Sequence, residues 1–367
     1  MGCGLVAQVM HLPYLRELDD RFEVTGLCDL SPAALAFAGR LFPDAQRTTD
    51  WRELVAGPLD AVLVLTPGSH APIALAAADA GVHAFVEKPF SLSVDEGLEV
   101  VEAAERAGTR LMVGYMKRFD PAFERLDEEL PRAGLRLARI TTLESPLEPY
   151  VEHVPLALGR DVDPGILAEL AADDDRRVSA AIGTDDPLLR RAYRSILLDS
   201  MVHELNAVRA LLGEPDELRF VDVWGEPSGL TATLVFGDVE CVFLWVDLPG
   251  IAHYEQEWSF FAPDMRATLR LPSPFLRSAP SVLELEGGEA GTPAAWRAEH
   301  VVSYDEAFKR ELVEFHDCIV EGREPRTGAR DALRDVALCT SFVRCCLERR
   351  PVQSPSDPDL HASRALH

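Results

Sequence analysis

The chain has 367 residues, of which 47% are apolar, so it is long enough for two domains with separate hydrophobic cores. Its 36 Lys and Arg against 61 Asp and Glu residues give a net charge of −25, which repels the phosphates of nucleic acids and the anionic surface of membranes. No apolar run reaches the roughly 20 residues of a membrane-spanning helix, and seven scattered cysteines indicate free thiols in a reducing, cytoplasmic compartment, not disulfides or a metal site.

The chain opens with a glycine-rich segment, Gly2-Cys3-Gly4-Leu5-Val6-Ala7, followed by a helical pattern. In a dinucleotide-binding unit, Gly2 and Gly4 allow a tight turn and a close approach to pyrophosphate, which binds at the helix N-terminus. A short strand then ends at Asp29, 25 positions after Gly4 (29 − 4). A carboxylate there binds ribose hydroxyls and repels the extra phosphate of NADP, so the sequence favours NAD over NADP.

The strand that should precede this segment is apparently missing, because only Met1 comes before Gly2. In the doubly wound order that strand lies centrally, and a sheet without it would have unpaired backbone edges. Two explanations are open. Either the true start lies upstream, which we favour, or the dinucleotide site is damaged.

Strands and helices then alternate up to Gly114, which predicts a doubly wound parallel sheet in a domain of residues 1–118. Ser31 and Asp50 are expected to cap the helices that follow them directly, and Ser93 or Asp95 the last helix. The predicted elements are helix Pro32–Leu41, helix Trp51–Ala56, strand Asp60–Leu65, helix Ala71–Ala80, strand Val82–Val86, helix Glu96–Ala107 and strand Arg110–Gly114.

The strand Val82–Val86 leads into Glu87-Lys88-Pro89. Pro89 lacks an N–H and biases Lys88 toward extended geometry, so the strand should stop there. Ligands bind outside the carboxyl ends of parallel strands, and a partly desolvated lysine at that position shifts its pKa readily. Taken alone, these residues also fit a surface lysine beside a glutamate.

Residues 119–350 show a different pattern, which predicts an α+β domain with an open, mainly antiparallel sheet. The long segment 144–186 is expected to shape a binding pocket, and its charged run Asp173–Arg177 is interpreted as a solvated helix end or loop. A Phe-rich stripe on helix Tyr304–Glu321 is interpreted as core, and residues 351–367 as a disordered tail. The other predicted elements are helix Ala122–Leu130, strand Leu135–Leu143, helix Leu188–Leu212, strands Leu218–Trp224, Leu230–Phe236, Val239–Val246, Trp258–Ala262 and Met265–Leu271, and helix Ala329–Arg349.

Helix Leu188–Leu212 carries Asp199 and His203, four positions apart and therefore on one face of an α-helix. Apolar neighbours imply partial burial, and a carboxylate one turn away can stabilise the charged imidazole. Such a histidine can accept a proton near neutral pH. A purely structural Asp–His pair is the alternative.

Taken together, these motifs resemble the Gfo/Idh/MocA family, the relatives of glucose–fructose oxidoreductase and inositol dehydrogenase. The resemblance covers nearly the whole chain and adds Thr66-Pro67 with His70, Val113-Gly114-Tyr115 with Arg118-Phe119, and the C-terminal Phe-rich helix. It implies a Rossmann domain, a second domain whose open sheet often forms homodimers or homotetramers, and catalytic roles for Lys88, Asp199 and His203. It also implies that the nicotinamide cofactor, NAD or NADP, contacts Gly2, Gly4, Leu5, Val6, Asp29, Thr66, Pro67, His70, Glu87, Lys88 and Pro89.

The function expected on this basis is hydride transfer between the cofactor and a secondary alcohol of a sugar, cyclitol or related polyol. His203 would exchange the hydroxyl proton, Lys88 would stabilise the developing negative charge on oxygen, and Asp199 would orient His203. A non-catalytic protein of the same fold that senses a dinucleotide or carbohydrate is the competing hypothesis.

Overall fold

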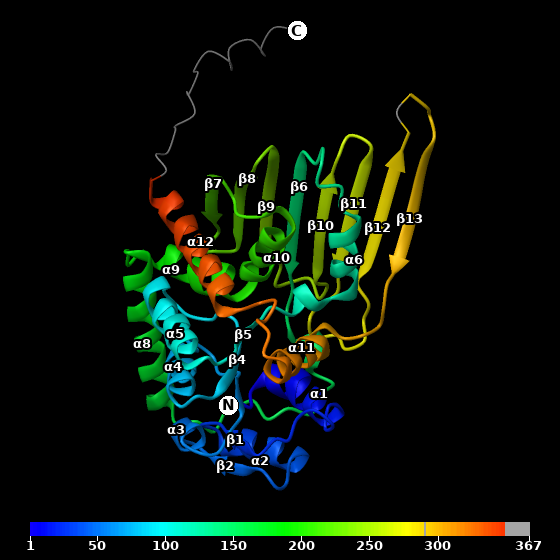
Figure 1. The fold of residues 1–367 in the computed structure, drawn as a ribbon. Helices are drawn as coiled ribbons and strands as arrows, with labels where there is room; N and C mark the ends of the chain where they lie inside the picture. The colour runs from blue at the N-terminus through cyan, green and yellow to red at the C-terminus, as the bar shows by residue number, and fades with distance from the viewer. Residues whose placement is uncertain (290, 349–367) are drawn as a thin grey trace.

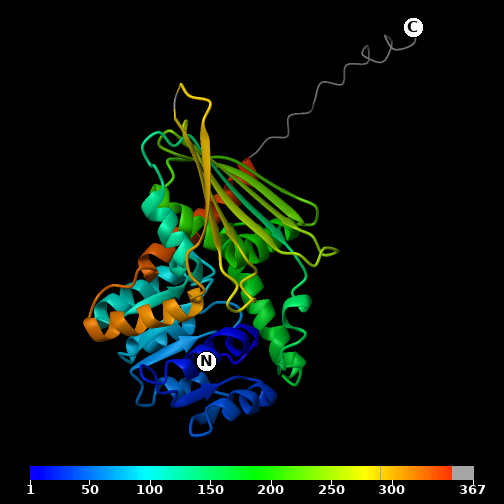
Figure 2. The same ribbon diagram turned by 90° about the vertical axis from the view of Figure 1, so that its right-hand side faces the viewer.

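The computed structural model describes residues 1–289 and 291–348, and the predicted tail lies outside them. A unit of parallel strands and helices lies below one large twisted sheet (Figures 1 and 2). This arrangement confirms the predicted fold class, a Rossmann-type unit followed by a domain with a mainly antiparallel sheet. None of the described helices is long and apolar enough to cross a lipid bilayer.

The Rossmann-type unit has five short parallel strands in two sheets, one of order β1-β2 and one of order β3-β4-β5. Apolar runs form β3 and β4 because both of their faces are covered by helices. The bounds of the strands are β1 Gly26–Cys28, β2 Gln46–Thr48, β3 Ala61–Val64, β4 His83–Glu87 and β5 Leu111–Gly114.

Met1 and Gly2 bridge the two parallel sheets where a central strand was expected. The Met1 ammonium donates to the Leu63 carbonyl at 2.8 Å, the Leu65 N–H donates to the Met1 carbonyl at 2.7 Å, and the Gly2 N–H donates to the Cys28 carbonyl at 2.8 Å. Gly2 has φ +81°, and a Cβ there would lie 2.6 Å from the backbone of Leu65, so only glycine fits. These two residues pair with both neighbouring strands at the carboxyl end of the sheet.

The helices of this unit begin at capping residues that the sequence predicted. Ser31 Oγ accepts from the Ala34 N–H at 3.0 Å, and Ser93 Oγ accepts from the Glu96 N–H at 3.2 Å. Gly108 ends the last helix in the left-handed conformation, at φ +68°. The bounds are π-helix η1 Ala7–His11, α1 Leu12–Glu17, α2 Pro32–Leu41, α3 Trp51–Val55, α4 Ala71–Asp79 and α5 Val94–Ala107.

The large sheet has eight strands in the order β13-β12-β11-β10-β6-β9-β8-β7, and all of its pairs are antiparallel except β6 with β9. Some helices of this part lie against one face of the sheet, and others lie beside the Rossmann-type unit (Figures 1 and 2). Its strands are β6 Leu137–Glu144, β7 Glu217–Trp224, β8 Gly229–Phe236, β9 Val239–Asp247, β10 Glu255–Phe261, β11 Met265–Leu271, β12 Val282–Gly288 and β13 Ala295–Val301. Its helices are η2 Met116–Phe119, α6 Pro121–Glu129, α7 Glu148–Val151, α8 Pro164–Ile182, α9 Pro187–Arg191, π-helix η3 Ala192–Met201, α10 Val202–Leu212, α11 Ala307–Glu321 and α12 Ala329–Glu348.

Two expectations about this part were wrong. The charged run Asp173–Arg177 lies inside α8, not at a helix end, because its charges pair within the helix and with neighbouring helices, as in the bond from Arg177 Nε to Asp173 Oδ2 at 2.7 Å. Strands β12 and β13 were missed, and so was β2 in the first unit. Strand β13 is exposed along most of its length, so its sequence lacks the buried alternation that marks a strand.

Helices α11 and α12 return to the Rossmann-type unit, although they come last in the chain (Figure 1). Phe308 and Leu312 pack with the cluster around Met10, while Phe315 packs edge-on against Phe85 at a centroid distance of 5.8 Å. The prediction that the Phe stripe is core is confirmed.

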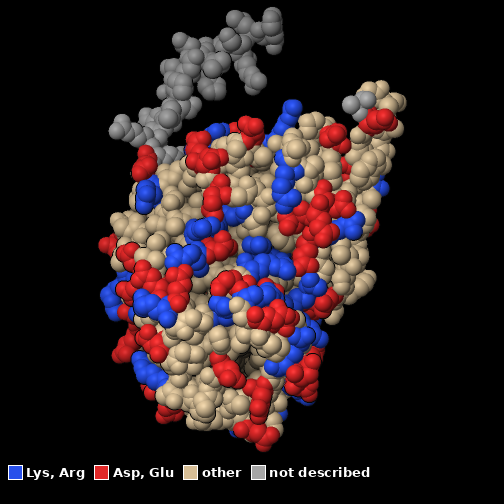
Figure 3. All heavy atoms as spheres, in the orientation of Figure 1, with Lys and Arg blue, Asp and Glu red and all other residues tan. Residues whose placement is uncertain are grey.

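Basic and acidic side chains are interspersed over the face shown in Figure 3. The chain forms many ion pairs between its basic and acidic side chains, such as the pair of Arg330 with Glu105 at 2.7 Å. The acidic excess of the chain therefore does not collect in one patch on that face.

Candidate active site

A cavity of about 540 Å³ lies between the carboxyl ends of the parallel strands and the large sheet. The Rossmann-type unit and its junction contribute Val6, Glu87, Lys88, Gly114 and Lys117 to the wall. Helices η3 and α10 contribute Asp199 and His203. The large sheet with its loops contributes Glu144, Tyr150, Trp245, Asp247 and Tyr254. Lys88, Asp199 and His203, which the sequence singled out separately, thus meet in one cavity.

Lys88 follows the last residue of β4 and reaches across the cavity to η3. Its Nζ donates to Asp199 Oδ1 at 2.7 Å and to the Asp199 backbone carbonyl at 2.5 Å. Burial by itself would lower the pKa of Lys88, but the carboxylate of Asp199 outweighs it and the pKa is raised. Lys88 is therefore a cation at neutral pH, held in one position.

His203 is not paired with Asp199, contrary to the expectation from their spacing. No hydrogen bond or ion pair joins them among the described residues, and His203 Nδ1 is buried without a partner. The physical reason is that Asp199 lies in the π-helix η3 and His203 in α10, so the turn between them is wider than an α-helical turn.

The charge state expected for His203 is also corrected. Burial lowers its pKa well below the usual 6.5, and the cations Lys117 and Lys88 lower it further. His203 is thus a neutral imidazole at neutral pH. A neutral imidazole is the form that can accept a proton.

A buried polar network that the sequence analysis missed supports this region. Lys117 Nζ donates to Glu204 Oε1 at 2.9 Å, and both side chains are almost fully buried. Gln256 Nε2 also donates to Glu204 Oε1, and to Thr142 Oγ1 at 3.0 Å. Lys117 precedes Arg118 and Glu204 follows His203, two residues that the sequence analysis had singled out, and that adjacency was the available signal.

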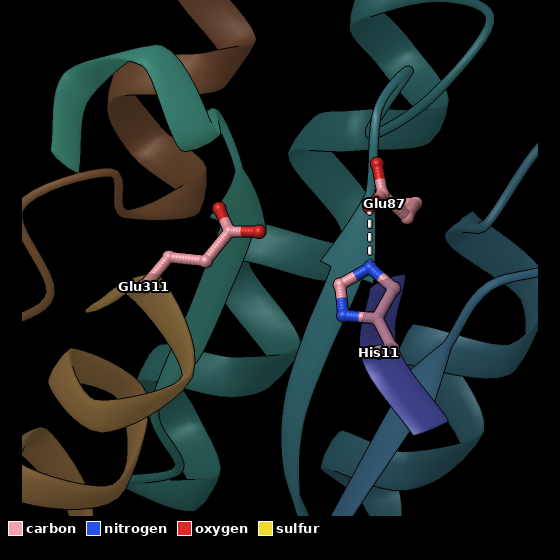
Figure 4. A group of neighbouring side chains, drawn as sticks. All are labelled: His11, Glu87 and Glu311. Atoms are coloured by element: carbon pink, nitrogen blue, oxygen red, sulfur yellow. Dashed lines mark hydrogen bonds and ion pairs between the residues drawn. The ribbon is translucent and has the colours of Figure 1, made fainter. Parts of the chain in front are cut away.

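Glu87 belongs to a second cluster that the sequence did not reveal, with His11 of η1 and Glu311 of α11 (Figure 4). His11 Nε2 lies 2.7 Å from Glu87 Oε1, and neither oxygen of the buried Glu311 carboxyl has a partner. Burial and the charge of Glu87 raise the pKa of Glu311 well above its usual value. Burial opposes ionisation of Glu87 too, but His11 outweighs it and lowers the pKa of Glu87.

One potential ligand atom from each of these three residues lies within 4.8 Å of the others, close enough for the set to be tested as a metal site. Two ligands of one tetrahedral zinc ion are about 3.3 Å apart, whereas His11 and Glu87 are at hydrogen-bond distance. In the structure the cluster is a hydrogen-bonded His11–Glu87 pair facing Glu311, whose raised pKa favours the protonated carboxyl.

The residues around the glycine-rich segment fit a dinucleotide. A Cβ on Gly4 would meet no atom within 4 Å, so the backbone there is open to a ligand. Asp29 Oδ2 accepts from the Cys3 N–H at 2.6 Å, and Asp29 Oδ1 accepts from the Ser31 N–H at 2.7 Å. These bonds hold the carboxylate at the end of β1, where an adenosine ribose binds in this fold.

The other predicted cofactor contacts are distributed around this region. Val6 lines the cavity, whereas Leu5 packs on the cluster around Met10. The ring nitrogens of His70 lie 2.6 Å from the Thr66 carbonyl and 2.7 Å from the Pro89 carbonyl, so His70 joins the turns after β3 and β4. Thr66, Pro67, His70 and Pro89 lie outside the cavity wall, and their part in cofactor binding stays a prediction.

Comparisons with known proteins identify relatives of this chain by sequence and by fold. The model of the Gfo/Idh/MocA family, described as an oxidoreductase family with an NAD-binding Rossmann fold, matches residues 1–115. Inositol 2-dehydrogenase 3 of Saccharopolyspora erythraea is 31% identical over 357 residues, covering 94% of this chain and 90% of that protein. D-apiose dehydrogenase of Paraburkholderia graminis is 27% identical over 380 residues, with coverage of 97% and 89%.

Among solved structures, a levoglucosan dehydrogenase with NADH and levoglucosan superposes with a TM-score of 0.71 at 17% identity, covering 94% of this chain and 95% of that one. A 3-ketoreductase of Actinomadura kijaniata in complex with NADP has a TM-score of 0.68 at 18% identity, with coverage of 93% and 94%. Identities this low establish the shared fold only. The full-length sequence relatives are named dehydrogenases, which favours an enzyme over a sensor. The chain belongs to the Gfo/Idh/MocA oxidoreductase family and is a nicotinamide-dependent dehydrogenase.

Proposed function

We propose that the enzyme transfers a hydride between NAD and a secondary alcohol or ketone of a sugar, cyclitol or related polyol. The observation that carries this proposal is the cavity that brings a lysine cation and a neutral histidine together at the carboxyl ends of the parallel strands. Its other polar side chains, such as Tyr150 and Asp247, suit a substrate with several hydroxyl groups. The relatives named for inositol and D-apiose act on molecules of this kind.

In the oxidation direction, His203 accepts the proton of the substrate hydroxyl. Lys88 donates a hydrogen bond to the same oxygen and stabilises its developing negative charge. Asp199 holds the Lys88 ammonium in place, so its role is to position Lys88 instead of orienting His203. Burial, aided by the charges of Lys117 and Lys88, lowers the pKa of His203 and keeps it neutral before the reaction. A bound nicotinamide supplies the hydride acceptor, and in reduction His203 returns the proton.

The preference for NAD over NADP rests on Asp29. Its carboxylate stands at the predicted ribose position, where it can accept from hydroxyls and repels a phosphate that carries a charge of about −1.5 to −2. Related structures contain NADH in one case and NADP in another, so the family alone does not decide between them.

The test is a cofactor titration followed by a substrate panel. NADH binding is measured by nicotinamide fluorescence, and NAD reduction is then followed with inositol isomers, D-apiose and levoglucosan. We expect saturable NADH binding and turnover of at least one polyol. Binding without turnover of any sugar, cyclitol or polyol would contradict the proposed substrate class, and absence of binding would contradict the cofactor.

We also propose a homodimer or homotetramer formed through the large sheet. The helices that cover this sheet lie on one of its faces, and Leu137 and Trp224 remain 37% and 39% exposed on its strands. Light scattering coupled to size-exclusion chromatography should give a dimer or tetramer mass, and a Trp224→Glu variant should shift it toward the monomer. A native monomer at micromolar concentration would contradict the proposal. The cytoplasmic location stays a prediction.

A further inference from the structure

The segment from Glu152 to Asp163 crosses the dinucleotide-binding end of the Rossmann-type unit. The Ala157 N–H donates to Gln8 Oε1 at 2.8 Å, and Gln8 Nε2 donates back to the Ala157 carbonyl at 2.7 Å. Gln8 is 3% exposed and also donates to the Cys3 carbonyl at 2.6 Å, inside the glycine-rich segment. A loop that follows β6 of the large sheet is thereby fastened to the cofactor-binding turn.

The same segment delivers a carboxylate to the N-terminus of α2. Asp161 Oδ1 accepts from Ser31 Oγ at 2.5 Å, and Asp161 Oδ2 accepts from the Ala33 N–H at 2.9 Å. The N–H of Ser31 meanwhile donates to Asp29 Oδ1 at 2.7 Å. One serine therefore holds two carboxylates side by side, one from β1 and one from a segment 130 positions further on.

Asp161 also accepts from a backbone N–H at the N-terminus of α2. Pro32 has no N–H, the Ala34 N–H donates to Ser31 Oγ, and the Leu35 N–H donates to the Ser31 carbonyl. The Ala33 N–H is the remaining one of the first turn, and Asp161 takes it. Backbone donors of this kind are what a phosphate would need at a helix N-terminus.

We infer that Asp161 is a second specificity-determining residue, which together with Asp29 selects a free 2′-hydroxyl on the adenosine ribose and rejects a 2′-phosphate. This inference deepens the proposed use of NAD and rests on it. A carboxylate accepts hydrogen bonds from ribose hydroxyls, whereas a 2′-phosphate would meet two carboxylates, and the N–H groups of the first turn of α2 are already used.

The residue directly before Asp161 is a cation, Arg160. It is exposed and makes no hydrogen bond or ion pair with the other described residues, and it precedes Asp161 directly. An arginine near the ribose is the usual partner of a 2′-phosphate. In this segment the cation Arg160 is followed directly by the carboxylate of Asp161.

The test compares dissociation constants for NADH and NADPH in native protein and in Asp161→Asn and Asp161→Ala variants, by nicotinamide fluorescence. Native protein should prefer NADH, and each variant should lower the ratio of the NADPH constant to the NADH constant by roughly tenfold, as expected for removing one charge near a phosphate. Adding Arg160→Ala should reverse part of that gain. Glu152→Gln removes one charge from the same segment without a contact to α2 and should leave the ratio unchanged within twofold.

The possible outcomes distinguish failure of the proposed cofactor from failure of the proposed role of Asp161. If native protein binds neither nucleotide, the proposed cofactor fails. If it binds NADH but the Asp161 variants leave the ratio unchanged, or change both constants equally, Asp161 does not determine specificity and the inference is overturned. A native preference for NADPH would overturn it as well.

Discussion

Nζ of Lys88 lies 2.7 Å from Oδ1 of Asp199, a residue 111 positions further along the chain. Asp199, which was expected to pair with His203, therefore pairs with Lys88. The pKa values of Lys88 and His203 are shifted in opposite directions. Asp199 raises the pKa of Lys88, while burial and nearby cations lower that of His203. The result is a cationic hydrogen-bond donor beside a neutral base, which is the pair that oxidation of an alcohol needs.

Replacing Asp199 with Asn should lower kcat/KM for the best polyol by roughly tenfold or more, because the Lys88 ammonium is no longer held in position. Loss of the carboxylate also lowers the pKa of Lys88, so the alkaline limb of the pH–rate profile should move to lower pH. Steady-state kinetics across pH measure both effects. The exposed carboxylate of Asp185 supplies a matched control as Asp185→Asn, and equal profiles for both variants would contradict the role of Asp199.

Replacing His203 with Gln should lower kcat by about 10²–10⁴, the usual worth of a general base. The native acid limb should lie below pH 6.5, because the histidine must lose its proton to act as a base and its pKa is depressed. That limb should disappear in the variant, which a purely structural role would not cause. Turnover within about threefold of native, with the limb retained, would rule out proton transfer by His203.

Replacing Glu311 with Gln should stabilise the protein increasingly as pH rises above 4.5. Below that value the carboxyl is protonated in both folded and unfolded chains, so it makes no difference. Above it, the unfolded chain releases the proton while burial keeps the folded carboxyl neutral, and stability is lost as pH rises. The gain in the free energy of unfolding should grow by up to about 1.4 kcal/mol per pH unit over the range in which the unfolded carboxyl is ionised and the folded one is neutral.

Urea titrations at several pH values measure this gain. Glu128→Gln, at an exposed position on α6, controls for the loss of one charge. A loss of stability in the Glu311 variant that is the same at every pH would contradict the assignment of a protonated carboxyl.

Replacing Phe315 with Ala should lower the free energy of unfolding by about 3–5 kcal/mol, because this fully buried ring fills the junction between α11 and the parallel sheet. Val320, on the same helix and 70% exposed, provides the control as Val320→Ala, which should change stability by less than about 0.5 kcal/mol. Chemical denaturation measures both. Similar losses in the two variants would show that α11 does not pack as described.

Much of the fold could be predicted from the sequence because the signals are local. Ser31 and Ser93 cap helices through bonds to residues three positions ahead, and Gly108 ends a helix by adopting positive φ. Strand β13 gave no such signal, since an exposed edge strand lacks the alternation that burial imposes.

The sequence by itself determined which chemistry the chain carries. Lys88 before a proline at a strand end, His203 among apolar residues and Asp29 after a short strand are all recognisable without a structure, because each rests on a local pattern. What only the tertiary structure decided is which of these groups meet. Asp199 pairs with Lys88, Glu87 with His11, and Ser31 with Asp161, across 111, 76 and 130 positions. A π-helical turn redirects Asp199, and the packing of α11 against the Rossmann-type unit buries Glu311. Pairing and burial set the charge of each group, and both depend on neighbours that chain order does not specify.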